Sequence, residues 1–130
     1  MSNYAEKGIH GEYTQLYIAG MFIGAMTAHE DIQDAKIGEE LRNSSFQYAS
    51  ELIKNCEANV GKIKSAYSEF LMVASHIVTA LIQKDRTYDY KMTYYIHDAI
   101  DCALKLTLMA EKELETNKKL NYKPKYAKQT

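Results

Sequence analysis

The chain has 130 residues, of which 46% are hydrophobic and 25% charged, and its net charge is −1. This composition is typical of one globular domain with its own core, and it excludes an intrinsically disordered chain. All seventeen Asp and Glu lie in the first 116 residues, whereas five of the sixteen Lys and Arg follow them. The acidic balance of the first 116 residues argues against a nucleic-acid-binding surface on the folded body.

Helical periodicity dominates the chain. The only proline is Pro124, so nothing in the 123 residues before it prevents long helices. Apolar residues recur at intervals of three and four, and no run alternates with the period of a strand. The sequence therefore predicts an all-α fold, an up-and-down bundle of four helices joined by short connections.

The first predicted helix covers residues 12–31 and carries apolar side chains around nearly its whole circumference, which predicts burial on most sides. Within it, Gly20, Gly24 and Ala28 recur every four residues and form a smooth stripe where another helix can approach closely. The apolar stretch over residues 16–28 is shorter than the roughly 20 residues needed to cross a bilayer, so we expect no membrane span.

The start of the second helix has two interpretations. In the first, which we favour, a loop near residues 34–38 ends at Gly38 and the helix begins at Glu39. In the second, the helix begins at Ser44, which has the spacing of a capping box. In both, an apolar stripe over residues 48–60 faces the core.

The third and fourth predicted helices differ in the width of their apolar faces. Residues 63–82 show one clear face, which is typical of an ordinary core helix. Residues 89–117 show more than one face, because Ile100, Leu104 and Leu108 form a second apolar strip. Such a helix either lies at the centre of a bundle or presents the surplus strip to another subunit, and we expect self-association.

The predicted domain boundary follows the fourth helix. We assign residues 1–117 to the helical bundle and residues 118–130, which hold five lysines, to a disordered lysine-rich tail. Contact with nucleic acid is expected only through this tail.

The two cysteines, Cys56 and Cys102, both fall on apolar sides of predicted helices. This placement predicts buried thiols in a reducing compartment, and therefore a cytoplasmic protein. The sequence contains none of the usual metal or cofactor motifs, so we predict no cofactor.

Tyrosine is the clearest compositional signal, with eleven tyrosines and no tryptophan in the chain. Tyr88, Tyr90, Tyr94 and Tyr95 fall within eight residues at the head of the fourth helix. Tyrosine provides a large amphipathic contact area and is enriched at interfaces. We therefore predict partner contacts by six residues of this region, namely Tyr88, Tyr90, Tyr94, Ile100, Leu104 and Leu108.

A second candidate site involves two histidines. His97 and Asp101 are four residues apart on the fourth helix and face the same side. With His76 on the third helix and Tyr94, they are candidates to line a pocket between helices that binds a small molecule or nucleotide and possibly catalyses its reaction.

The predicted function is that of a non-enzymatic binding protein, which recognises a partner macromolecule, and we expect a protein partner, as an adaptor, an inhibitor or a small subunit of an assembly. This prediction depends on the surplus apolar strip, the small-residue stripe and the tyrosine cluster. The alternatives are the pocket-based binder and nucleic-acid contact through the tail.

Overall fold

The computed structural model describes residues 13–119 and contains four α-helices, two short 3₁₀ helices and no strand in that range. The predicted all-α bundle of four helices is therefore confirmed. Residues 120–130, most of the predicted tail, lie outside the described residues. The helices are α1 (Thr14–Met26), α2 (Ala35–Asn59), η1 (Val60–Lys62), α3 (Tyr67–Lys84), η2 (Tyr88–Lys91) and α4 (Met92–Lys119).

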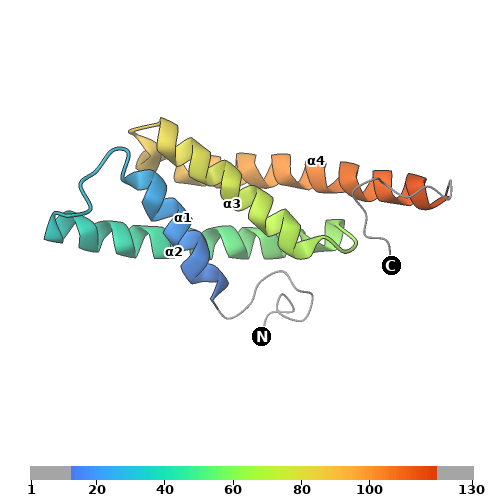
Figure 1. The fold of residues 1–130 in the computed structure, drawn as a ribbon, viewed down its shortest axis with the longest axis horizontal. Helices are drawn as coiled ribbons and strands as arrows, with labels where there is room; N and C mark the ends of the chain where they lie inside the picture. The colour runs from blue at the N-terminus through green and yellow to red at the C-terminus, as the bar shows by residue number, and fades with distance from the viewer. Residues whose placement is uncertain (1–12, 120–130) are drawn as a thin grey trace.

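Successive α-helices reverse direction, as an up-and-down bundle requires (Figure 1). α2 and α4 run roughly along the long axis of the molecule, while α1 and α3 cross that axis obliquely in the opposite direction. α1 packs mainly against α2 and α3, and α4 packs mainly against α3. The short α1 therefore lies on one side of the bundle, and α4 extends past its neighbours.

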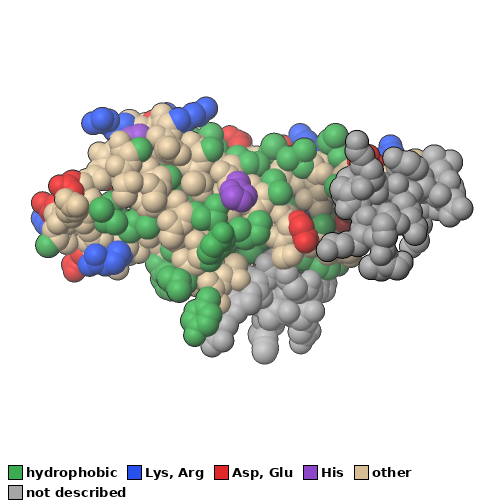
Figure 2. Space-filling view, in the orientation of Figure 1, with side chains coloured by type: hydrophobic (Ala, Val, Ile, Leu, Met, Phe, Trp, Pro, Cys, Tyr) green, Lys and Arg blue, Asp and Glu red, His purple; other side chains and the backbone are tan. Residues whose placement is uncertain are grey.

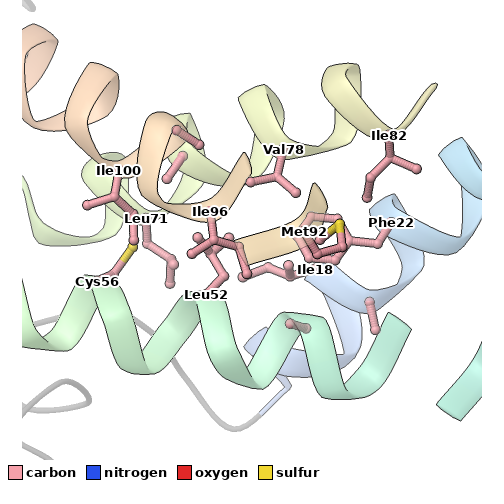
Figure 3. Packing of buried hydrophobic residues seen from close by; sticks show 14 of the residues in the cluster. Ile18, Phe22, Leu52, Cys56, Leu71, Val78, Ile82, Met92, Ile96 and Ile100 are labelled. Atoms are coloured by element: carbon pink, nitrogen blue, oxygen red, sulfur yellow. The ribbon is translucent and has the colours of Figure 1, made fainter. Parts of the chain in front are cut away.

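The hydrophobic core lies where the four helices meet. Leu52 and Cys56 project from α2 into this space, and Ile96 and Ile100 project from α4 toward them (Figure 3). Phe22 anchors α1 and is fully buried. Burial of such large side chains is the main stabilising contribution to a bundle of this size.

α1 is buried on one side only, so the prediction of burial on most sides is wrong. Its buried residues share the face toward α2 and α3, and they are Ile18, Ala19, Phe22, Ala25 and Met26. On the opposite face, Tyr17 is 62% exposed. A Cβ at Gly20 or Gly24 would meet no neighbouring part of the described chain within 4 Å. The two glycines of the predicted small-residue stripe therefore approach no neighbouring part of the described chain closely, and Ala28 lies beyond the end of α1.

α2 begins earlier than either interpretation of the sequence allowed. The carboxylate of Asp34 accepts hydrogen bonds from the backbone N–H groups of Lys36 and Ile37, both at 3.0 Å. This N-cap starts the helix at Ala35, because it satisfies two of the N–H groups that a helix leaves unpaired. Ser44 lies inside the helix.

Gly38 has a packing role and does not break the helix. It lies in the first turn of α2, where its N–H donates to the carbonyl of Asp34 at 2.8 Å. A Cβ at this position would lie 2.7 Å from the backbone oxygen of Ile32. The loop before α2 therefore approaches the helix more closely than any larger residue would permit.

The other helix boundaries shift by only a few residues. The third helix begins at Tyr67, four residues later than predicted, although Ile63 is buried in the connection that precedes it. The fourth begins at Met92, because residues 88–91 form the 3₁₀ helix η2. Within residues 13–119, none of these helices combines the length and apolar character needed to cross a membrane.

The two cysteines lie in different environments. Cys56 is fully buried, whereas Cys102 is exposed, so the predicted burial of Cys102 is wrong. Both are free thiols. Burial raises the pKa of the Cys56 thiol to about 12, which suppresses the reactive thiolate at neutral pH.

The close contact at Gly38 gives a first prediction. Gly38→Ala should lower the free energy of unfolding by about 1–3 kcal/mol, because the added Cβ must displace the backbone of Ile32. Gly61→Ala is the matched control, since a Cβ there meets nothing within 4 Å. Urea denaturation followed by circular dichroism measures both. A Gly38→Ala variant as stable as the control would contradict the close approach.

The thiols give a second prediction. A disulfide reagent such as DTNB at neutral pH should titrate one thiol of the native protein, Cys102, and two thiols after denaturation. Cys102→Ser should remove the native signal, and Cys56→Ser should leave it in place. Rapid reaction of both thiols in the native state would show that the core around Cys56 is less well closed than described.

Candidate protein-interaction surface

The tyrosines at the head of α4 divide between the core and the solvent. Tyr88 is buried, and its hydroxyl donates a hydrogen bond to the carboxylate of Glu30. Tyr90 and Tyr94 are 88% and 71% exposed. Tyr88 is therefore unavailable to a partner in this structure, and only Tyr90 and Tyr94 remain as candidate contacts from the predicted cluster.

The three residues of the predicted apolar strip of α4 also differ in burial. Ile100 is buried in the core, and Leu104 is partly buried and packs against the core. Leu108 is exposed. Ile100 is thus a core residue and presents no side chain to a second protein.

The largest exposed apolar side chains of α4 lie in its distal half. Leu106, Met109 and Leu114 are 48%, 67% and 54% exposed. This part of the helix extends beyond the bundle (Figure 1), and Figure 2 shows hydrophobic side chains along the edge of the molecule that α4 forms. Clustered exposed apolar side chains of this size commonly mark an interaction site.

A groove of about 580 Å³ runs between the distal half of α4 and the first half of α3. Its lining is mostly apolar, with Val73 on α3 and Leu106, Ala110 and Leu114 on α4. The three α4 residues are four positions apart, so they follow one ridge of the helix. The volume falls within the usual range for binding pockets, about 300–1,000 Å³.

One end of this groove continues into a second depression of about 300 Å³. Ser65 and Leu114 border both spaces. Glu111 lines the second depression, together with Lys64 and Glu115, which form an exposed ion pair at 2.9 Å. The mostly apolar groove is therefore continuous at one end with a depression that has polar and charged side chains in its lining.

Glu111 fixes the geometry of that depression. Its Oε2 accepts hydrogen bonds from the backbone N–H groups of Lys64, Ser65 and Ala66 at 2.8, 2.9 and 3.4 Å. These groups precede α3, whose own N-cap, Ala66, supplies no side-chain hydrogen bond. Glu111 therefore caps the connection that leads into α3, and only the Ala66 N–H belongs to the end of the helix itself, where a negative charge is favoured.

Burial opposes ionisation of Glu111, but the three backbone hydrogen bonds outweigh it and hold the pKa of this carboxyl below its usual value. Its second oxygen, Oε1, is buried and accepts no hydrogen bond from the described residues. A buried carboxylate oxygen without a partner is costly and would be stabilised by an added donor.

The acidic rim gives the groove a preferred ligand charge. Glu69 lines the groove itself, and Glu111 and Glu115 border the adjoining depression. Lys64 is the only basic residue among the described residues that line these two spaces. Net negative charge beside an apolar trough favours a ligand with an apolar face and basic side chains.

A separate polar depression of about 360 Å³ lies at the opposite end of the bundle, and it has a structural explanation. The hydroxyl of Tyr48 donates to Asp89, and that of Tyr88 donates to Glu30. Burial and the bond to Glu30 raise the pKa of Tyr88 well above its usual range, so it remains a donor. These bonds attach η2 to α2 and to the loop after α1. The lining residues are His29, Glu30, Glu40, Leu41, Ser44, Arg86, Tyr88, Asp89 and Tyr90.

The four residues of the predicted histidine pocket, His76, Tyr94, His97 and Asp101, are all exposed. His97 borders a depression of about 240 Å³ with Glu51, Asn55, Thr93 and Ile96, and neither His76 nor Asp101 is among its lining residues. The carboxylate of Asp101 instead pairs with Lys105 at 3.0 Å. Among residues 13–119, no group of three or more His, Cys, Asp or Glu side chains is arranged to hold a metal ion.

Comparisons with known proteins add no assignment. No protein-family model matches the chain, and searches of curated proteins and of solved structures also give no significant match.

The cap formed by Glu111 can be tested by mutation. Glu111→Ala should lower the free energy of unfolding by about 1–2 kcal/mol at neutral pH, because three backbone N–H groups lose their acceptor. Glu113→Ala, at an exposed neighbouring position, should change it by less than about 0.5 kcal/mol. Thermal and urea denaturation measure both variants.

The effect of pH follows from the lowered pKa of Glu111. The folded protein binds this proton more weakly than the unfolded chain, so the stabilising contribution is complete above the ordinary value of 4.5 and declines as pH falls below it. The stability difference between the wild type and Glu111→Ala should therefore shrink in acid. A difference that stays constant from pH 7 to pH 3 would contradict the cap.

Proposed function

We propose that this protein is a non-enzymatic binding protein that holds an amphipathic, basic helical segment of a partner protein in the groove between α3 and α4. The observation that carries the proposal is the groove itself. It has a volume of about 580 Å³ and a mostly apolar lining, and it lies beside a helix that extends past its neighbours. Helix-in-groove recognition uses this combination of an apolar trough and a polar rim.

The shape of the groove favours a helix as its occupant. Leu106, Ala110 and Leu114 form a ridge with a small residue at its centre, and Val73 faces them from α3. A small residue between two larger ones lets a crossing helix approach closely at that point. Apolar side chains of the partner at helical spacing would then fill the trough on either side of Ala110.

The charges near the groove favour a basic segment. Glu69 lies beside the apolar part, and Glu115 lies at the end that Glu111 caps. A lysine or arginine of the partner at this end would pair with Glu115 in place of the exposed Lys64. Breaking the Lys64–Glu115 pair costs little free energy, because an exposed ion pair contributes at most about 1 kcal/mol.

The competing functions have less support in the described residues. A small-molecule site built from His76, His97 and Asp101 lacks a shared cavity. Nucleic-acid contact was predicted only for the lysine-rich tail, most of which lies outside the described residues.

A synthetic peptide tests the proposed function. The probe is a fluorescein-labelled, roughly 18-residue helix of Leu and Lys, with Leu at positions i, i+3, i+4 and i+7. We expect binding with a Kd on the order of 10 µM by fluorescence anisotropy. Leu106→Glu should weaken binding at least tenfold, because it places a charge in the apolar lining of the trough.

Two controls separate groove binding from general attraction to an acidic protein. Leu108→Glu introduces the same charge at another exposed leucine of α4, which does not line the groove, and should change Kd less than about twofold. A peptide with Glu in place of Lys should bind more weakly. Equal losses in both protein variants, or equal binding of the two peptides, would refute the proposal.

A further inference from the structure

The outer face of α1 is a second apolar surface, distinct from the groove between α3 and α4. From Tyr13 to Ala28 the chain contains no Asp, Glu, Lys or Arg. Nevertheless Tyr13, Leu16 and Tyr17 are 69%, 61% and 62% exposed. Figure 2 views the side of the molecule that carries α1, and hydrophobic side chains protrude there. A solvent-facing helix normally carries charged residues on its outer side.

The residues of this face fall on one stripe. With 100° between successive residues, Tyr17, Gly20 and Gly24 lie within an arc of about 60° on α1, and Tyr13 directly precedes the helix as its N-cap. The first half of this stripe carries two tyrosines, and its second half carries two glycines. A Cβ at either glycine would meet no neighbouring part of the described chain within 4 Å, so the fold itself does not require glycine there.

We propose that two copies of this chain associate through the outer faces of α1, with the two α1 helices antiparallel about a two-fold axis near Gly20 and Met21. In this arrangement Tyr17 of each copy lies over Gly24 of the other. The bulky half of each stripe fills the smooth half of its partner. A parallel arrangement would place tyrosine against tyrosine and leave the glycines facing each other.

A second copy fits this face better than an unrelated partner for two reasons. The face carries no charge and so needs no partner of complementary charge, and its two halves complement each other in shape only when one copy is reversed. A two-fold axis produces that reversal, because it makes the same surface serve both subunits.

The available area is sufficient for a weak dimer. Fully covered aromatic side chains bury about 150–250 Å² each, so the exposed parts of Tyr13 and Tyr17 offer roughly 250 Å². With Leu16 and the glycine backbone, each copy contributes on the order of 500 Å², which brings the pair to about 1,000 Å², the lower limit for a biological interface and the size of weak, transient ones. We therefore expect a reversible dimer with a Kd on the order of 10 µM.

Sedimentation velocity of the full chain from 5 to 500 µM tests this inference. The wild type should pass from monomer to dimer over this range. Gly24→Leu should weaken association at least tenfold, because the new side chain occupies the space of the second copy's Tyr17. Its melting temperature at 5 µM should not fall, since a Cβ at this exposed position meets nothing within 4 Å and leucine is a better helix former than glycine. Ala58→Leu, at an exposed position of α2, should dimerise like the wild type.

Cysteine cross-linking tests the antiparallel geometry and does not depend on how the leucine variant folds. All chains carry Cys102→Ser, because that thiol is exposed. A mixture of chains with Tyr17→Cys and chains with Gly24→Cys should form mainly the mixed disulfide, and either chain alone should form little.

Three other results would each overturn the proposal. A wild type that stays monomeric at 500 µM excludes the dimer. A dimer that persists in Gly24→Leu places the interface elsewhere, for example at the groove between α3 and α4. Disulfides that form mainly between like chains exclude the antiparallel arrangement.

Discussion

The unequal lengths of the helices determine which apolar surfaces this bundle can cover. At 1.5 Å per residue, the 13 residues of α1 span about 20 Å and the 28 residues of α4 span about 42 Å. Side chains that project toward the bundle from the middle of α4 meet the core, and Ala103 is fully buried. Further along the same helix the apolar pattern continues without full cover, so Leu106 and Leu114 border a groove.

The extended half of α4 keeps a defined position because Glu111 ties it to the start of α3. One carboxylate oxygen accepts from the backbone N–H groups of Lys64, Ser65 and Ala66, and this connects the segment before α3 to the side of α4. The cap thus adds a polar contact at one end of the groove, whose two walls are already held together by the packing of α3 against α4.

The sequence was sufficient to predict the class of fold and the approximate extent of each helix, because helical periodicity and the absence of early prolines are local properties. Prediction from the sequence failed for features that depend on tertiary packing. Gly38 suggested a break, yet its role is to admit the backbone of Ile32, which lies six residues away. The Asp34 N-cap carried a readable signal, an aspartate just before the helical pattern resumes.

The candidate interaction residues show the same limit. Periodicity groups Ile100, Leu104 and Leu108 as one strip, but it does not show where the neighbouring helices end. In the structure Ile100 is buried in the core, and Leu104 is partly buried against it. Leu106 and Ala110 share the stripe of the buried Ala103, yet both are exposed, so their own spacing does not show which of these residues the neighbouring helix covers. Glu111 resembles any surface glutamate in the sequence, because its partners lie about 46 residues earlier.

The described residues thus leave two apolar surfaces uncovered, and they differ in kind. The groove has acidic residues at its edge, which suits a basic partner, whereas the α1 face is uncharged and self-complementary. The two surfaces lie on different helices, so a dimer formed through α1 would leave the groove available in each copy. Such an arrangement would present two grooves to a partner and increase its apparent affinity through avidity.

The central claim, that the groove is accessible in the free protein, is tested most directly by methyl-detected NMR with a soluble paramagnetic probe. We predict that the methyl groups of Leu106, Met109 and Leu114 relax about as strongly as those of the exposed Leu108, while those of the buried Leu52 and Leu71 are protected. Protection of Leu106 and Leu114 equal to that of Leu71 would show that the chain covers its own groove, and would contradict the account.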